Sequence, residues 1–116
     1  MKFEELDPML AAPARVAILA TLADGHPWLF SDLREETRLA DGNLHVQTRK
    51  LKDAGYIAGE KVPQGGRRVT RFRLTDTGRQ ALSAHVRRLE RALKRGDETD
   101  GRSRSSARRD DGGRVW

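Results

Sequence analysis

LADGNLHVQTRKLKDAGYI, residues 39–57, is the stretch that decides how this chain folds. Within it Leu44, Thr48 and Leu51 follow one another at steps of four and three, which places their side chains on one face of a helix. Gly55 supplies a left-handed helix stop. The stretch therefore predicts a turn over residues 38–41, a helix with a polar and basic outer face, and the start of a strand.

A hairpin is predicted directly after this helix. Residues 56–62 favour a strand, and the turn-forming residues 63–66 follow it. Residues 69–74 then alternate, with Phe72 on one face and Arg71 on the other. The two strands should form a hairpin whose inner face packs on the helices.

Two shorter helices are predicted before residue 39. Residues 13–23 carry apolar side chains at helical spacing, and Pro13 suits a first turn. Residues 28–30 are apolar and predict either a brief strand or a connector that fills the core. Ser31 is expected to cap a helix over residues 32–37, and Asp41 to cap the helix that follows.

A long helix is predicted after the hairpin, over residues 76–94, with Thr75 as its cap. Four apolar residues recur along it at steps of four, three and four, which is the spacing of a coiled-coil seam. This seam predicts a homodimer, formed through Leu82, Val86, Leu89 and Leu93. Residues 1–95 would be one domain, and the polar residues 96–116 a disordered tail.

The chain's positive charge is concentrated in its middle. The net charge of the 116 residues is +6. Residues 1–36 carry three basic and seven acidic side chains, and residues 96–116 carry five of each, which leaves +10 on residues 37–95. A basic block on a folded domain is typical of proteins that bind a polyanion.

The order helix, helix, helix, hairpin, helix is that of a winged helix-turn-helix, a mainly α fold with a small β-hairpin (α+β). The third helix would enter the major groove of DNA, and the hairpin would be the wing. The amides of Asn43 and Gln47 can pair with adenine, and Arg49 with guanine. The predicted contacts on this helix are Gly42, Asn43, His45, Val46, Gln47, Arg49 and Lys50.

A second group of residues is predicted to contact the DNA backbone or its minor groove. Two glycines at the hairpin tip let the backbone approach closely, and an arginine beside them suits the negative minor groove. The group comprises Arg38, Lys52, Gly65, Gly66, Arg67, Arg68 and Arg71.

Three stretches resemble a bacterial MarR/ArsR-like winged-helix transcriptional regulator, and most of all a small stand-alone winged-helix DNA-binding domain. They are LDPMLAAPARVAIL at residues 6–19, residues 41–51 with AGY at residues 54–56, and LTDTGR at residues 74–79. The resemblance implies a homodimer that binds operator DNA and usually represses transcription. Thr48 departs from the larger aliphatic residue that such regulators tend to have.

Other functions receive little support from the sequence. The chain lacks cysteine, a paired nucleophile and base, and a phosphate-binding loop, so we expect no enzyme activity, no cofactor and no metal site. No apolar run is long enough to span a membrane. The absence of cysteine fits a cytoplasmic protein, so a cytoplasmic location is expected. The sequence leaves open whether a small-molecule effector binds and changes the dimer geometry. The alternative is a winged-helix module that binds another protein and does not read DNA.

Overall fold

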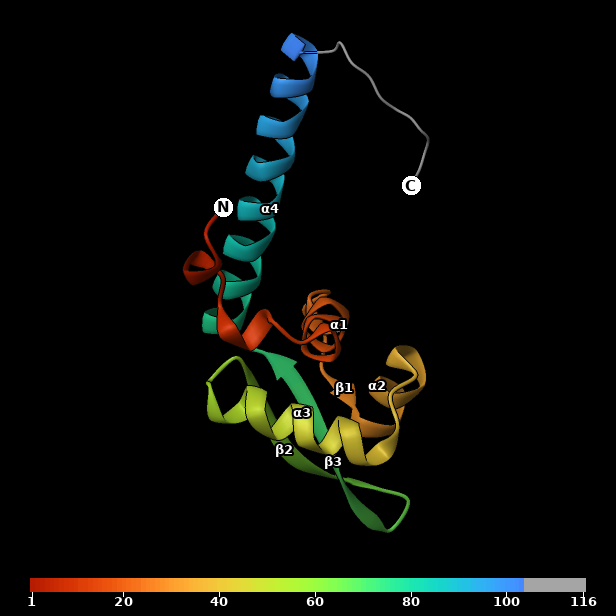
Figure 1. Cartoon of the computed structure of the whole chain (residues 1–116). Coiled ribbons are helices and arrows are strands. Elements are labelled where there is room, and N and C mark those ends of the chain that lie inside the picture. Colours follow the sequence, from red (N-terminus) through yellow and green to blue (C-terminus); the bar gives the residue numbers. More distant parts are fainter. Residues whose placement is uncertain (104–116) are drawn as a thin grey trace. The chain divides into compact units, whose positions relative to one another are not determined.

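Three helices supply most of the hydrophobic core. The computed structural model describes the backbone of residues 1–103 and the side chains of residues 1–97. In it α1 spans Pro13–Leu22, α2 Phe30–Thr37 and α3 Asp41–Asp53 (Figure 1). Two short 3₁₀ turns, η1 (Phe3–Glu5) and η2 (Pro8–Leu10), precede them. The largest fully buried side chains all come from the three helices: Ile18, Leu19, Leu22, Leu33, Leu44 and Leu51.

A three-stranded antiparallel sheet packs against these helices. It consists of β1 (Trp28–Leu29), β2 (Ile57–Gln64) and β3 (Arg67–Leu74), in the order β1-β3-β2. The short apolar run before α2 is therefore a strand, and its pairing with β3 adds a third strand to the hairpin and makes β3 the central one. The inner face of the sheet closes the core with buried Ile57 and Phe72.

The hairpin turn is tighter than predicted. The ladder between β2 and β3 continues to the pair Gln64–Arg67, so only Gly65 and Gly66 form the turn. Their φ angles are +57° and +77°. Positive φ at both central residues defines a type I′ turn, whose twist matches that of the flanking strands. Glycine is favoured at both positions because residues with a Cβ rarely adopt this conformation.

Two of the predicted helix caps are wrong. The N-cap of α2 is Leu29, the last residue of β1, because the chain passes directly from strand to helix and Ser31 lies within the first turn. The N-cap of α3 is Ala40, and Asp41 is the first helical residue. The Asp41 carboxylate instead accepts a hydrogen bond from Arg34 Nη1 at 2.7 Å, which ties α3 to α2.

The glycine stop of α3 and the cap of α4 are confirmed. Gly55 has φ +82°, and the Tyr56 N–H donates to the Leu51 carbonyl at 2.9 Å, as in a Schellman motif. Thr75 Oγ1 accepts a hydrogen bond from the Gly78 N–H at 3.0 Å. A Cβ on Gly78 would lie 2.1 Å from the Tyr56 carbonyl oxygen, so only glycine allows α4 to begin here.

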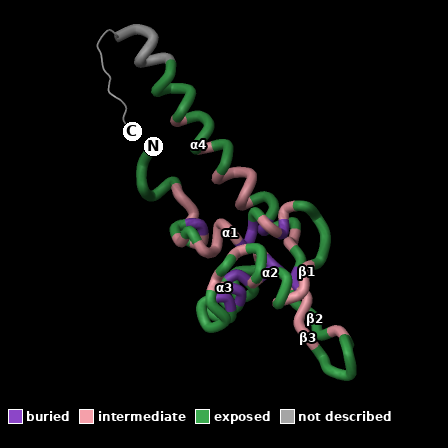
Figure 2. The backbone as a smooth tube through the Cα atoms, turned by 90° about the vertical axis from the view of Figure 1, so that its right-hand side faces the viewer, coloured by how far each residue is buried: buried purple, intermediate pink, exposed green. Residues whose placement is uncertain are grey.

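The last helix, α4, spans Asp76–Ser103 and so continues beyond the predicted end at residue 94. Residues 96–103, predicted to be disordered, are helical, because the helical hydrogen bonding continues past Gly96; residues 104–116 lie outside the described residues. Contacts divide the chain into residues 2–85, which hold every buried position in Figure 2, and residues from Val86 onward together with Met1. None of the helices within the described residues is long and apolar enough to cross a membrane.

Candidate nucleic-acid interface

The polar face of α3 is exposed, as its apolar spacing predicted. Leu44, Thr48 and Leu51 are buried. The Thr48 hydroxyl donates to the Leu44 carbonyl at 2.8 Å, so this polar group is satisfied inside the core. Most of the outer face meets solvent, including Gly42, Asn43, His45, Val46, Arg49 and Lys50.

A groove of about 1230 Å³ lies between α3 and the hairpin of β2 and β3. Cations on both walls line it, whereas its acidic residues are Asp53 and Glu60. The Glu60 carboxylate accepts two hydrogen bonds from Arg71, from Nε at 3.1 Å and from Nη2 at 2.5 Å, which offsets its charge. The cations in the groove are Arg49, Lys50, Lys52, Lys61 and Arg68.

The groove brings together six of the residues singled out in the sequence, namely His45, Val46, Arg49, Lys50, Lys52 and Arg68. The remaining eight lie outside its lining. They are Gly42, Asn43 and Gln47 toward the N-terminal end of α3, Arg38 in the turn before it, and Gly65, Gly66, Arg67 and Arg71 in the hairpin.

Lys61 is a groove residue that the sequence interpretation missed. It pairs with Thr70 in the β2–β3 register, two residues beyond the pair of Gly59 with Phe72. Since alternate strand residues share a face, Lys61 lies on the face that carries Phe72 into the core. The alternation that starts at buried Ile57 could have identified it.

An aromatic stack positions His45 within the groove. The His45 and Phe30 rings stack with their centroids 4.3 Å apart and an interplanar angle of 24°. Phe30 also lies 6.5 Å from the Phe72 ring, which belongs to the core. The imidazole is therefore exposed but supported by a ring at the start of α2. Neither Phe30 nor its role follows from the α3 sequence.

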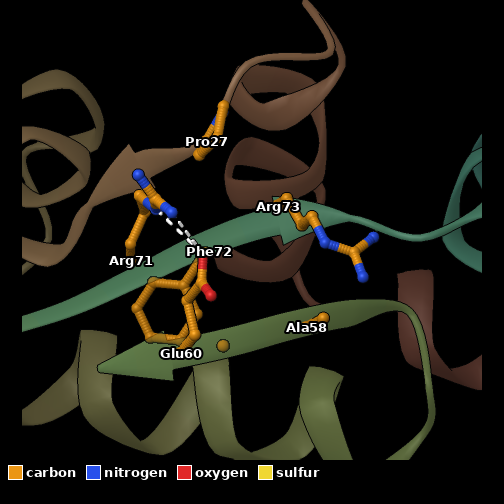
Figure 3. Close-up of a pocket in the computed structure, with 7 residues that line it drawn as sticks. Pro27, Ala58, Glu60, Arg71, Phe72 and Arg73 are labelled. Atoms are coloured by element: carbon orange, nitrogen blue, oxygen red, sulfur yellow. Dashed lines mark hydrogen bonds and ion pairs between the residues drawn. The ribbon is translucent and has the colours of Figure 1, made fainter. Parts of the chain in front are cut away.

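The opposite face of the sheet carries Arg71 and Arg73. Figure 3 shows the Arg71 guanidinium bonded to Glu60, while the Arg73 side chain points away from this pair. Both arginines are among the residues that line a small cavity of about 100 Å³. That volume is well below the roughly 300 Å³ at which small-molecule pockets begin. Because Arg71 is paired across the strands, it is a weaker candidate for a DNA contact than Arg68.

The N-terminal end of α3 favours an anion. Its N-cap residue, Ala40, has a methyl side chain that accepts no hydrogen bond, so the first backbone N–H groups of α3 are not capped by it. These N–H groups and the helix dipole attract negative charge. Arg38, in the turn just before, is exposed and has a left-handed φ of +63°.

Gln47 is placed differently from the other polar residues of α3. It is half-buried, and both atoms of its side-chain amide are bonded. Its Oε1 accepts from Arg15 Nη1 of α1 at 2.8 Å, and its Nε2 donates to Asn43 Oδ1 at 3.0 Å. Gln47 therefore links α1 to the exposed end of α3 instead of extending freely from the helix.

A family model described as a winged helix DNA-binding domain matches residues 14–93. The chain belongs to this winged helix family. It is 35% identical over 72 residues to an uncharacterised protein of Methanocaldococcus jannaschii, a match that covers 62% of this chain and 78% of the relative.

Solved structures of several other proteins share the fold of this winged helix domain. The transcriptional regulator homologue of Pyrococcus horikoshii OT3 has a TM-score of 0.70 at 26% identity, over 77% of this chain and 88% of that one. Bacillus subtilis PadR, solved in complex with operator DNA, has a TM-score of 0.57 at 25% identity. That match covers 66% of this chain and 46% of PadR, so the chain spans less than half of PadR.

The comparisons confirm the predicted winged-helix fold and its resemblance to transcriptional regulators. In this winged helix domain α2 and α3 form the helix-turn-helix, and β2 and β3 form the wing. Within the described part of the chain, His, Asp and Glu side chains form no group of three or more that could hold a metal ion.

Proposed function

We propose that this protein is a homodimeric transcriptional repressor that reads duplex DNA, with α3 in the major groove and the wing on the flanking backbone. The observation that carries the proposal is the groove between α3 and the wing, whose two walls both present cations. A DNA strand carries a phosphate at every nucleotide, and a groove of this kind can follow it.

The exposed face of α3 has the chemistry needed to read base edges. Arg49 can donate two hydrogen bonds to guanine, and His45 is held in place by its stack on Phe30. Val46 is 49% exposed, so its methyl groups are accessible to a ligand on this basic surface. It suits the methyl group of thymine, which is the apolar feature of the major groove.

The wing supplies contacts that position the protein on the duplex. Its glycine tip has no side chains beyond hydrogen, so the backbone can come close to DNA. Arg68 lines the groove from the wing, and Arg67 is exposed beside the tip. We propose that Arg68 and Lys61 contact phosphates, and that Arg67 reaches the minor groove.

Dimerisation is proposed to occur through α4. Leu82 is partly buried and packs against the hydrophobic core of residues 2–85, so it would contribute less surface to a dimer than the residues that follow it. Val86, Leu89 and Leu93 are 44%, 46% and 69% exposed, at the three- and four-residue steps of a helix seam. A second copy of α4 would cover these side chains, whose exposure is otherwise unfavourable.

Sedimentation can test the dimer directly. The double substitution of Val86 and Leu89 by lysine should convert a dimer to a monomer, because it places charges inside the seam. Glu90→Lys adds the same charge at an exposed neighbouring position and should leave the dimer intact. A wild-type protein that sediments as a monomer would contradict this part of the proposal.

The relatives support the DNA-binding proposal. PadR was solved on operator DNA, which shows that a domain of this fold can engage a duplex. Repression is favoured by the resemblance to regulators that usually repress.

Selection of bound duplexes from a random pool is the test of the proposed function. A homodimer should enrich a palindrome whose half-sites lie about one helical turn, roughly 34–36 Å, apart. Affinity for the enriched duplex should fall steeply as salt rises, because bound phosphates release counterions. A pool that shows no enrichment, together with a salt slope near zero, would favour the protein-binding alternative.

A further inference from the structure

A chain of hydrogen bonds runs from α1 to the exposed N-terminal end of α3. Arg15 Nη1 donates to Gln47 Oε1 at 2.8 Å, and Gln47 Nε2 donates to Asn43 Oδ1 at 3.0 Å. Asn43 is exposed in the first turn of α3, where a recognition helix meets base edges. These hydrogen bonds therefore connect Arg15 of α1 to Asn43, a candidate base reader.

The first member of this chain is held firmly. Arg15 Nε donates to the Met9 carbonyl at 2.8 Å, and Arg15 Nη2 reaches the Pro8 carbonyl at 3.4 Å. The η2 turn that supplies both carbonyls is itself anchored, because the Asp7 carboxylate accepts from the Met9 N–H and from the Tyr56 hydroxyl. The guanidinium thus has a set position and direction before any ligand is present.

The chemistry of Arg15 determines the polarity of the whole chain. A guanidinium carries only donors, so the Gln47 atom that faces it has to be the acceptor, Oε1. The other end of the amide, Nε2, is a donor and faces Asn43. The Asn43 atom that receives it then has to be Oδ1, which leaves the two N–H groups of Asn43 Nδ2 for a partner.

This polarity changes which bases Asn43 can read. A free asparagine pairs with adenine by accepting from N6 and donating to N7. The Asn43 oxygen keeps a second lone pair, but its bond to Gln47 turns it toward that residue, so the Nδ2 donors are the groups that Asn43 directs toward a ligand. Guanine presents two adjacent acceptors, N7 and O6, in the major groove. Adenine offers only one acceptor there, beside an N6 donor that would face the donors of Asn43.

We propose that Arg15 is a specificity-determining positioning residue, which acts through Gln47 to make Asn43 a hydrogen-bond donor that selects guanine over adenine. The inference rests on the proposed function, because it requires the N-terminal end of α3 to meet base edges. It goes beyond that function in assigning a base preference to Asn43 and a role to a residue of α1.

Gln47→Glu reverses the chain and is the decisive variant. A carboxylate at position 47 still accepts a hydrogen bond from Arg15. Because it has no donor, Asn43 can bond to it only by donating from Nδ2, so the Asn43 amide turns and presents Oδ1 outward. Selection from a random pool should then show, at one position in each half-site, a change from guanine to a base with a donor, adenine or cytosine. The change in preference should be roughly 5- to 150-fold, the range for one bidentate contact.

Two further variants separate this effect from charge and from folding. Ala54→Glu adds the same carboxylate at the exposed C-terminal end of α3, away from the hydrogen bonds that join Arg15, Gln47 and Asn43. It should lower the affinity for DNA without changing the base preference. Arg15→Met removes the donor that orients Gln47 and should narrow the preference for guanine over adenine. Its thermal melting identifies any general loss of folding.

The outcomes distinguish the inference from the proposed function. If the wild-type protein enriches no sequence, both are overturned. If it enriches an operator, and Gln47→Glu and Arg15→Met keep the wild-type preference at every position, the proposed function stands and the role of Arg15 is refuted. A Gln47→Glu protein too weak to select DNA leaves Arg15→Met to decide.

Discussion

Removing one cation from the wing offers a quantitative test of how the protein meets DNA. Arg68 lines the groove from β3, opposite the cations of α3, and is exposed. If it neutralises one phosphate, Arg68→Ala should reduce the slope of log affinity against log salt by about 0.9 for each copy of the chain. A dimer with both wings on the duplex should therefore lose about 1.8 from the slope.

This slope change corresponds to a large difference in affinity. If the wild-type and variant affinities converge near 1 M salt, a slope change of 1.8 weakens binding at 0.1 M roughly 60-fold. Fluorescence anisotropy of a labelled duplex, titrated at several salt concentrations, measures both quantities. The weakening should be similar for all duplex sequences, because phosphate contacts carry no direct sequence information.

Arg73→Ala is the matched control. It removes the same charge from the same strand, but Arg73 lies on the opposite face of the sheet, outside the groove lining. Its slope should stay close to that of the wild type. Equal losses from Arg68→Ala and Arg73→Ala would refute the placement of DNA in the groove, and a loss near 0.9 would contradict binding by two wings.

Three further predictions concern stability. Gly78→Ala should lower the free energy of unfolding by about 1–3 kcal/mol or more, because the new Cβ would lie 2.1 Å from the Tyr56 carbonyl oxygen. Urea denaturation should show this loss. The control Gly96→Ala should not show it, because a Cβ there meets open space among the described residues. Burial, together with the hydrogen bond to Asp7, raises the pKa of Tyr56 from 10.0 to about 12. The folded state holds the Tyr56 hydroxyl proton more tightly than the unfolded state. The protonated hydroxyl therefore makes its full contribution to the free energy of unfolding below pH 10, and this contribution is lost as the pH rises toward 12. The pH dependence of urea denaturation should show a decline over this range that is smaller in Tyr56→Phe, and an equal decline in both proteins would contradict the assignment. Arg38→Gly should raise the unfolding free energy by about 0–1.5 kcal/mol, since it relieves left-handed strain of roughly 1–2 kcal/mol at an entropy cost of roughly 0.5–1 kcal/mol. A clear loss of stability in the same assay would show that the Arg38 side chain makes a stabilising contact.

Local chemistry made much of the fold predictable from the sequence. The steps between Leu44, Thr48 and Leu51 identified the buried face of α3, and all three are buried. Gly55 and the Gly65–Gly66 pair adopt the positive φ angles that their turns require. These features depend on residues close together in the chain, where backbone sterics and helical period leave few alternatives.

Contacts between distant residues decided the rest. Ser31 and Asp41 have good capping side chains, yet β1 pairs with β3 and starts α2 at Phe30, and Arg34 holds the Asp41 carboxylate. The direction of the Gln47 amide is set by Arg15, which lies 32 residues away in sequence.

The sequence by itself thus determined which segments form helices, where the chain turns and which face of α3 is basic, because each follows from the period and the backbone preferences of neighbouring residues. The tertiary structure decided which polar groups on that face are free to meet a ligand. A hydrogen-bond donor or a cation is unavailable to a ligand once the fold brings a partner within about 3 Å of it, and that partner can come from anywhere in the chain.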